Sequence, residues 1–499
     1  MRGNSIMKKK WIASVLLAGL LPSLFSCGGD VPETETAMET EAAAIETETE
    51  AAYTSSIEQQ DFGGEEIRFY TYSNSHYQNS LMDIAAEELT GEVLNDAVFE
   101  RNNLLHEKFN IVLTWQDLDG RSKLDTALRT AVTSGDREAC DIVNNSTESN
   151  ILAGIDGYLL PAGEFPYIDL EKPWWNRKIM EDTSILGQNY FLVGDMNLDT
   201  WTQSYVVYFS KDMAEDYQIE NLYDIVREGG WTIDKLDEIT RRIYVDTNGN
   251  SEYDENDTYG FSACSVCVDC FWVSGAISFV EKDSEDALSI AISDAYYEMY
   301  EKISTLLAAP EMLYTDRPQY TAKRDTYDRG AFIENRALFF LEGLCVGDDR
   351  LREMEYPFGI LPVPKFNEIQ ETYCTYSHYG HNSSIALPLT SGDQVDMLCM
   401  ILEDMAFYSM DTVRPAYYDK MLEGRLAASE DDRDMLEIIT TNISYNIANL
   451  LFSGDMWSLR NAVSAGDPPA SFMASKEQSW TSKIKTIQNS IAENIENQG

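Results

Sequence analysis

Strands and helices alternate early in the chain, and this alternation restricts the fold more than any other feature. Runs of β-branched and aromatic residues at positions 67–72, 111–115 and 141–143 are typical of strands. Between them, residues 91–109 and 122–132 carry apolar side chains at helical spacing. Such an order indicates parallel βαβ units. The predicted fold class is therefore α/β.

The length of the chain predicts more than one lobe. Its 499 residues exceed the roughly 250 to 300 at which a single hydrophobic core stops growing. Residues 194–212, which read GDMNLDTWTQSYVVYFSKD, run from a polar, aromatic segment directly into the strand expected at 205–209. We expect the chain to pass from the first lobe to the second there, and we expect the ligand to bind beside this crossing. Ligands of parallel sheets gather beyond the carboxyl ends of strands, which also singles out residues 73–76 and 144–147.

The N-terminus predicts a lipoprotein signal peptide at residues 1–26. Three lysines precede an apolar run at 11–25 that is too short to cross a bilayer as a mature helix. The run ends in LFSC, which resembles a lipobox whose Cys27 becomes acylated; ordinary cleavage that leaves a free thiol is the alternative. Residues 27–60 are rich in Thr, Glu and Ala with nearly all charge of one sign, and predict a disordered tether.

The formal net charge of −48 restricts the partners. Nucleic acid and anionic lipid head groups would meet a repulsive field, so we expect no nucleic-acid partner. Contact with the membrane is expected through the lipid anchor only.

Residues 246–257, DTNGNSEYDEND, place oxygen-bearing groups at the spacing of an EF-hand calcium loop. Ser251 replaces the turn glycine and Asp257 replaces the bidentate Glu, so we expect a weaker site than that of a sensor protein. A structural Ca²⁺ is predicted, and a plain acidic turn is the alternative. The predicted ligands are Asp246, Asn248, Asn250, Glu252, Asp254 and Asp257.

Three cysteines have the spacing C-x₂-C-x₂-C at Cys264, Cys267 and Cys270. An iron–sulfur cluster, zinc or a local disulfide are possible by spacing alone. The apolar run at 261–280 and the extracytoplasmic compartment favour core packing, with the three sulfurs on one helical stripe. A longer helix is expected at residues 286–307.

No catalytic residue is predicted. A strand at 337–341 precedes GLCVG, which matches a nucleophile elbow with Cys345 as nucleophile. However, the sequence lacks an apolar helix start after it and a nearby histidine. His378 and His381 lie in a loop-like run, so a metal pair is not expected there. Adjacent Trp174 and Trp175 would face opposite sides of an extended segment, so one is expected in the core and the other beside a ligand.

The chain over residues 61–498 resembles an extracellular solute-binding protein of the sugar-binding type, the lipid-anchored receptor of an ABC importer. The resemblance rests on the order of several segments, among them GEVLNDAVFERNNLLHEKFNI, GDMNLDTWTQSYVVYFSKD, ALFFLEG, FGILPVPK, IALP and RPAYYDKMLEG. It implies a two-lobed, type II periplasmic-binding-protein-like α/β fold with a multi-strand hinge. The implied lobe 1 comprises residues 61–200 and 375–410, and lobe 2 comprises 201–374 and 411–499.

The resemblance also implies a function. A monomeric, non-enzymatic receptor at the outer face of the cell membrane would capture a carbohydrate, an oligosaccharide above all, and deliver it to the membrane permease subunits. A secreted glycan-degrading enzyme is the alternative, because carboxylates and aromatic residues are abundant. Aromatic rings suit the apolar face of a sugar, and amides and carboxylates suit its hydroxyls. The expected ligand contacts are Ser75, Asn145, Ser146, Trp175, Asp195, Gln203, Phe271, Trp272, Glu342, Gly343 and Trp457.

Overall fold

The computed structural model describes residues 53–75, 78–254, 256–317, 324–349, 351, 354–423 and 429–498. The predicted signal peptide and the lipidation site at Cys27 lie outside the described residues. The predicted tether is wrong at its C-terminal end. Ile57 is buried in the core, and Lys108 donates a hydrogen bond of 2.7 Å to Ser55 Oγ. Apolar burial holds these last residues in place, so the chain is ordered before residue 60.

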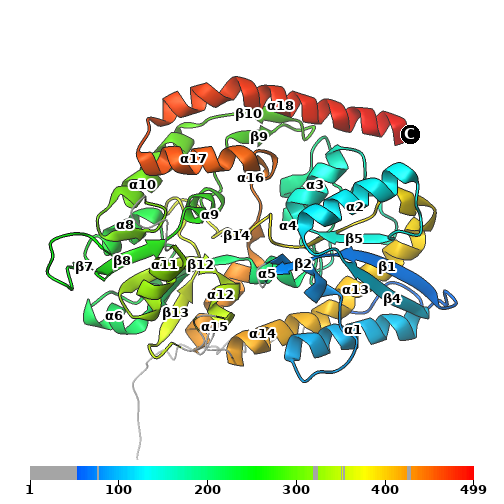
Figure 1. Cartoon of the computed structure of the whole chain (residues 1–499), viewed down its shortest axis with the longest axis horizontal. Helices are drawn as coiled ribbons and strands as arrows, with labels where there is room; N and C mark the ends of the chain where they lie inside the picture. The colour runs from blue at the N-terminus through cyan, green and yellow to red at the C-terminus, as the bar shows by residue number, and fades with distance from the viewer. Residues whose placement is uncertain are drawn as a thin grey trace, which may run out of the picture. The chain divides into compact units, whose positions relative to one another are not determined.

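The first sheet has four strands in the order β15-β5-β1-β4 (Figure 1). The first three strands of this sheet along the chain are β1 (Glu65–Thr71), β4 (Ile111–Asp117) and β5 (Ile142–Asn145). β1 pairs in parallel with both others, as the alternation predicts. The helices α1 (Val93–Phe109) and α2 (Arg121–Ser134) connect them. A distant strand, β15 (Ser384–Ala386), adds to β5 in the antiparallel direction.

The second sheet is mixed and has the order β11-β8-β12-β6-β13. β6 (Tyr205–Ser210) and β12 (Ala337–Gly343) are buried along their whole length and pair antiparallel. β13 (Phe358–Leu361) flanks β6, while β8 (Thr258–Ala263) and β11 (Met312–Tyr314) continue the sheet in parallel beyond β12. Burial on both faces explains why these strands are almost continuously apolar.

The remaining elements are short strands and the helices that cover the two sheets. The strands are β2 (Ser73–Ser75), β3 (Gln78–Asn79), β7 (Tyr244–Val245), β9 (Val280–Lys282), β10 (Leu288–Ile290), β14 (Thr375–Tyr376) and β16 (Ile443–Ser444). The helices are η1 (Ser80–Asp83), α3 (Thr147–Ile155), η2 (Ala162–Glu164), α4 (Arg177–Thr183), α5 (Leu198–Thr202), α6 (Lys211–Asp216), α7 (Leu222–Arg227), α8 (Ile233–Thr240), α9 (Val266–Ser274), α10 (Asp294–Ala308), α11 (Arg324–Ile333), α12 (Leu344–Asp349), η4 (Leu389–Gln394), α13 (Val395–Asp411), α14 (Val413–Glu423), α15 (Glu430–Thr441), α16 (Ile447–Leu451), α17 (Ser453–Ala465) and α18 (Pro469–Gln498).

Two local predictions are wrong. The helix expected at 286–307 begins only at Asp294, because the preceding β10 pairs with β9 as a hairpin. The three cysteines do not share one helical stripe, since Cys264 precedes α9 and only Cys267 and Cys270 lie on it. All three cysteines are buried in the core, as core packing predicts.

The chain passes between the sheets at three places. α5 leads directly into β6 of the second sheet, and the chain returns from β14 to β15 of the first. Isolated bridges join these two passages at Ser204–Ser377 and, on the side of the first sheet, at Leu192–Ile385. The third passage lies beyond α14, because α13 and α14 both pack on α1 while α15 packs on β13 of the second sheet. This passage therefore comes later in the chain than the boundary expected at residue 411.

The C-terminal helix α18 connects elements on both sides of these passages (Figure 1). Trp480 stacks on Phe279 with ring centroids 4.2 Å apart. At the other end of the helix, Asn494 donates hydrogen bonds to the carbonyls of Gly154 and Ile155 at the end of α3. Among the described residues, no helix combines the length and the apolar character that crossing a membrane requires.

Candidate functional site

Helix α5 lies between the two sheets and is bonded to both. The backbone N–H of Leu198 donates to Asp83 Oδ1 at 2.8 Å, next to the end of β1. On the other side, the N–H of Leu344, which follows β12, donates to the carbonyl of Ser204 at 2.9 Å. The side chains of this short helix are therefore positioned where the ends of the two sheets meet.

Five buried side chains around α5 form what we call the polar cluster: Tyr72, Thr147, Asp199, Gln203 and Asn382. Each has one polar atom without a hydrogen-bonding partner among the described residues. These atoms are Tyr72 Oη, Thr147 Oγ1, Asp199 Oδ2, Gln203 Nε2 and Asn382 Nδ2. The N–H of Thr147 donates to Asn382 Oδ1, and that of Gln203 to the carbonyl of Asp199. Thr200 Oγ1 of α5 donates to the carbonyl of Ser383, next to Asn382, and burial and the nearby charge of Asp199 raise the pKa of Tyr72. Buried polar atoms normally have partners, so such a group marks a place for a ligand or water.

Two buried carboxyl groups adjoin the polar cluster. Burial raises the pKa of Asp83 to about 6, although Leu198 N–H and Asn144 Nδ2 both donate to its carboxylate. Burial also raises the pKa of Asp199 well above its usual range, and the neighbouring charge of Asp83 adds to this effect. Both effects favour the protonated form of Asp199, which can donate as well as accept a hydrogen bond.

Aromatic side chains flank the polar cluster on the second crossing, where the chain returns from β14 to β15. Tyr376 packs against Tyr205 with ring centroids 5.5 Å apart, and the rings of His378 and His381 stack at 3.9 Å. Burial lowers the pKa of His381 to about 4 and that of His378 well below its usual value, so both are neutral. Next to these rings, Arg121 Nη1 donates a hydrogen bond to the carbonyl of Gly380 at 3.0 Å. No group of three or more His, Cys, Asp or Glu side chains suited to a metal occurs in the described part of the chain.

The contacts expected at the strand ends lie near the polar cluster, yet most of their side chains are engaged. Asn145 donates to Asp125 at 2.8 Å, and Ser146 caps α3 by accepting from the N–H of Ser149. Glu342 is paired with Arg329 at 3.2 Å. The carbonyl of Gly343 accepts from Tyr208 Oη. Ser75 ends β2, and the structure describes its backbone only. Of the expected contacts near the polar cluster, Gln203 has a buried polar atom without a partner among the described residues.

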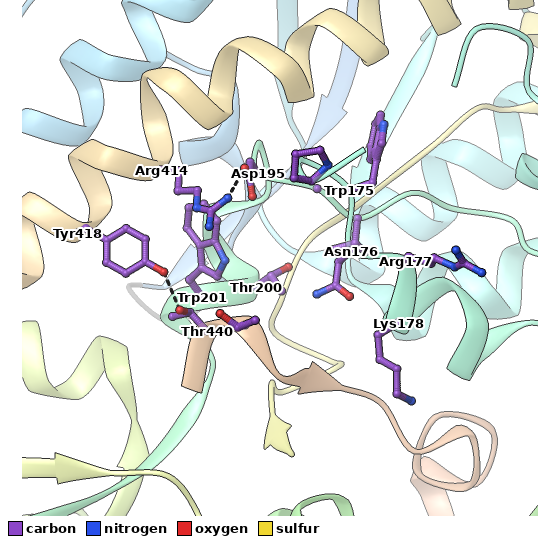
Figure 2. Close-up of a pocket in the computed structure, with 14 residues that line it drawn as sticks. Trp175, Asn176, Arg177, Lys178, Asp195, Thr200, Trp201, Arg414, Tyr418 and Thr440 are labelled. Atoms are coloured by element: carbon purple, nitrogen blue, oxygen red, sulfur yellow. Dashed lines mark hydrogen bonds and ion pairs between the residues drawn. The ribbon is translucent and has the colours of Figure 1, made fainter. Parts of the chain in front are cut away.

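Trp175 and Asp195 line a separate pocket of about 270 Å³, which we call the α5–α14 pocket (Figure 2). Its other walls include Trp201, Arg414 and Tyr418. Helix α5 contributes Thr200 and Trp201 to this pocket and Asp199 and Gln203 to the polar cluster. The expected contacts therefore divide between two places on either side of one helix.

The expectation that only one of the adjacent tryptophans lies in the core is wrong. Trp174 and Trp175 are both buried, and both indole N–H groups donate to the carboxylate of Glu403, at 3.2 and 2.8 Å. The segment turns here and does not continue as a strand, so alternation of faces does not apply. A Cβ atom at Gly194 would lie 2.9 Å from the Trp175 ring, which explains the glycine opposite it.

Three further expected contacts lie elsewhere. Phe271 is fully buried in the core beside Phe261. Trp272 stacks on Tyr296 with centroids 4.3 Å apart and lines another pocket, of about 420 Å³, with Tyr445. Trp457 is 53% exposed on α17 and outside the polar cluster.

Cys345 does follow a strand-to-helix turn, because β12 runs directly into α12. A short helix therefore does start there, although Asp348 and Asp349 replace the apolar start that an elbow needs. Burial nevertheless raises the pKa of the Cys345 thiol above its usual value, and the charge of Glu342 adds to this effect. A thiol held protonated in this way is a poor nucleophile.

The predicted calcium loop is folded around its own carboxylates. Asp246 accepts from the N–H groups of Gly249 and Ser251, and Asp257 accepts from those of Thr247 and Asp254. Ser251 has a φ of 61°, a conformation that favours the glycine usual in such loops. The oxygen donor set suits Ca²⁺, with Asn248 and Asn250 needed beside the acidic residues. The sixth predicted ligand, Glu252, would contribute its backbone carbonyl.

Sequence reasoning missed four members of the polar cluster. Tyr72 directly follows the first strand and Thr147 follows Ser146, so their positions at strand ends were visible. Asp199 lies one helical turn before Gln203, a spacing that indicates a shared face. Asn382 had no such signal, because it is 235 residues from Thr147 in the sequence and the two are neighbours only in the fold.

This architecture is the α/β fold of extracellular solute-binding proteins. It is similar to a family 1 extracellular solute-binding protein from Bifidobacterium longum subsp. infantis, at 12% identity and a TM-score of 0.51, covering 86% of this chain and 100% of that chain. A sugar transporter from Rhizobium etli in an open conformation is 14% identical with a TM-score of 0.54, covering 86% and 99%. A cyclo/maltodextrin-binding protein complexed with maltotetraose is 12% identical with a TM-score of 0.52, covering 87% and 97%.

At these identities the similarity concerns the fold alone. No family model matches the sequence, and no curated protein matches it. The predicted two-lobed α/β fold class is confirmed.

Proposed function

We propose that this protein is an extracytoplasmic receptor that captures a neutral carbohydrate, an oligosaccharide above all, between two lobes and delivers it to an ABC importer. The polar cluster carries the proposal. Its five buried atoms comprise donors, an acceptor carboxyl and hydroxyls, which are the partners that sugar hydroxyls require. A buried polar group without a partner costs about 1–3 kcal/mol, so a bound sugar that satisfies several of them is strongly stabilised.

The surroundings support a sugar over a charged solute. Tyr205 and Tyr376 offer aromatic surface beside the polar cluster, which suits the apolar face of a sugar ring. The cations at its border are engaged, because Arg121 is bonded to Glu148 and Arg460 is paired with Asp269. The solved structure of similar fold with maltotetraose agrees with this ligand class.

We further propose lobe boundaries at residues 201 and 375 and a third beyond α14, a lipid anchor at Cys27 and a structural Ca²⁺ in the 246–257 loop. The anchor rests on the lipobox alone and would hold a monomeric receptor at the outer face of the membrane. The acidic surface would keep the receptor from adhering to anionic lipid.

A panel of mono- and oligosaccharides tests the ligand class. A ligand that binds only the folded protein raises the melting temperature, by an amount that grows with its concentration. We expect at least one neutral oligosaccharide to do so at micromolar to millimolar concentration. A shift with peptides and none with sugars would assign another solute. Release of sugar from a labelled polysaccharide would favour the alternative, a secreted glycan-degrading enzyme.

A further inference from the structure

The α5–α14 pocket lies apart from the polar cluster and has a chemistry of its own (Figure 2). One wall is the segment from Pro173 to Lys178, and the opposite wall comes from α14 and the end of α15. Asp195 and Trp201 of the first crossing form its floor. With about 270 Å³, it lies just below the usual range of pockets for drug-sized ligands and suits a single small molecule.

Basic side chains outnumber acidic ones in this pocket, whereas acidic residues dominate the chain. The lining contains Arg177, Lys178 and Arg414 but only one carboxyl group, Asp195. The chain as a whole has 37 basic and 85 acidic residues. Arg177 and Lys178 are paired with acidic residues of their own helix, Glu181 and Asp182, which leaves Arg414 as the pocket's principal cation.

Arg414 is only weakly neutralised. Among the described residues its ion pair is with Asp195, at 3.5 Å, and its side chain is 38% exposed. Burial raises the pKa of Asp195 to about 7, so about half of these carboxyl groups carry no charge at neutral pH. A ligand carboxylate can therefore compete with Asp195 for the guanidinium, which binds carboxylates through two parallel hydrogen bonds.

The other lining groups suit a polyhydroxylated ring. Trp201 presents an indole beside Arg414, and Trp175 lines the opposite side (Figure 2). Asn176 uses its Oδ1 to cap α4 by accepting from the N–H of Ile179, which leaves the amide NH₂ as a donor. Thr441 adds a hydroxyl at the rim. Aromatic surface, amide and hydroxyl groups around one guanidinium are the partners that a sugar acid needs.

We propose that the α5–α14 pocket is a second binding site, which takes a monosaccharide-sized sugar acid with its carboxylate on Arg414 and its ring against Trp201. This site is separate from the proposed carbohydrate site at the polar cluster, and its existence does not depend on that proposal. Its walls include Trp201 of the first crossing and residues of α14 and α15, which lie before and after the third. Its occupant therefore contacts segments that lead to both sheets.

Calorimetric titration of the purified full chain tests the proposal, with D-glucuronate, D-glucose and acetate as probes. We expect glucuronate to bind at least tenfold more tightly than either control, because only it offers both the carboxylate and the ring. Arg414→Gln should weaken glucuronate binding at least tenfold, the loss expected for a hydrogen bond to a charged group. Arg433→Gln, at an exposed arginine of α15, is the matched control and should leave binding unchanged.

Two further variants keep the test decisive. Arg414→Lys retains the charge but not the planar fork, so it should fold as the parent does and lose binding severalfold. Asp195→Asn removes the competing carboxylate and should tighten binding. Equal affinity for glucose and glucuronate, or unchanged binding in both Arg414 variants, would overturn the proposal. So would a loss of glucuronate binding in Gln203→Leu, because the sugar acid would then occupy the polar cluster.

Discussion

Asp199 and Gln203 lie one helical turn apart at α5, and each has a buried polar atom without a hydrogen-bonding partner among the described residues. The same helix is bonded to Asp83 beside the first sheet and, through Ser204, to Leu344 at the end of β12. A ligand that satisfies Asp199 and Gln203 therefore contacts the segment that joins the two sheets. This geometry connects ligand binding with the arrangement of the lobes.

Asp199→Asn should stabilise the ligand-free protein and weaken sugar binding. Burial and the charge of Asp83 raise the pKa of Asp199 in the folded state. The unfolded state therefore loses this proton first, and Asp199 lowers the free energy of unfolding progressively as the pH rises above the unfolded value of about 3.8. The variant has no such cost. Urea unfolding at pH 4, 6 and 8 should show an advantage of the variant that grows with pH. A constant difference at all three values would contradict the assigned burial.

Arg460→Met should destabilise the protein by about 3–5 kcal/mol, the usual cost of leaving one partner of a buried ion pair alone. Arg460 Nε donates to Asp269 Oδ1 at 3.1 Å, and the Asp269 side chain is fully buried. Lys123→Met is the control, since the pair of Lys123 with Asp119 is more than half exposed on both sides and should contribute about 0–1 kcal/mol. Chemical unfolding of both variants measures the difference. Equal effects would show that the Arg460 pair is solvated.

His381→Gln should reduce the loss of stability in acid. In the folded state burial lowers the pKa of His381 to about 4, whereas in the unfolded chain it stays near 6.5. The unfolded state therefore binds the proton first, and this residue lowers stability progressively as the pH falls from about 6.5 to 4. Below that window its effect is constant. The free energy of unfolding of parent and variant, compared at pH 7 and pH 4.5, gives the contribution. Parallel pH dependences would show that His381 is solvated in the folded protein.

Removal of calcium should lower the melting temperature if the 246–257 loop binds the ion. Mass action stabilises a protein that binds an ion only when folded. Addition of a chelator to the parent should lower the melting temperature, and Ca²⁺ in excess should restore it. Asp246→Asn should melt at the same temperature with and without chelator. A parent protein that is unaffected by chelation would support the plain acidic turn.

The sequence predicts the sheet of the first lobe well, because its elements have clear periodicity. α1 and α2 carry apolar residues at helical spacing, and they alternate with β1, β4 and β5. The five residues of α5 span little more than one turn, which is too short to show a helical period. Periodicity also misleads at β10, where a hairpin replaces the expected helix start. These elements depend on tertiary contacts that a local pattern does not contain.

The candidate site is predictable only where it follows strand ends. Asn145 and Ser146 are at the end of β5 or directly after it, as expected of ligand positions in α/β sheets, whereas Gln203 precedes β6 and was expected only from its place at the first crossing. Yet Ser146 serves as a helix cap and Asn145 is bonded to Asp125, so position alone does not give the role. The partners of Gln203 come from distant segments, and their meeting depends on how the chain returns through β14.

Calorimetric titration with the neutral sugar that most raises the melting temperature tests the central claim most directly. Gln203→Leu removes the unpartnered amide from the polar cluster, and Gln478→Leu, on the exposed face of α18, is the matched control. We predict that Gln203→Leu weakens binding tenfold or more while it folds normally, because a lost hydrogen bond costs about 1.4 kcal/mol or more when its partner is left unpaired. Gln478→Leu should bind as the parent does. Binding by Gln203→Leu with the affinity of the parent would contradict the account.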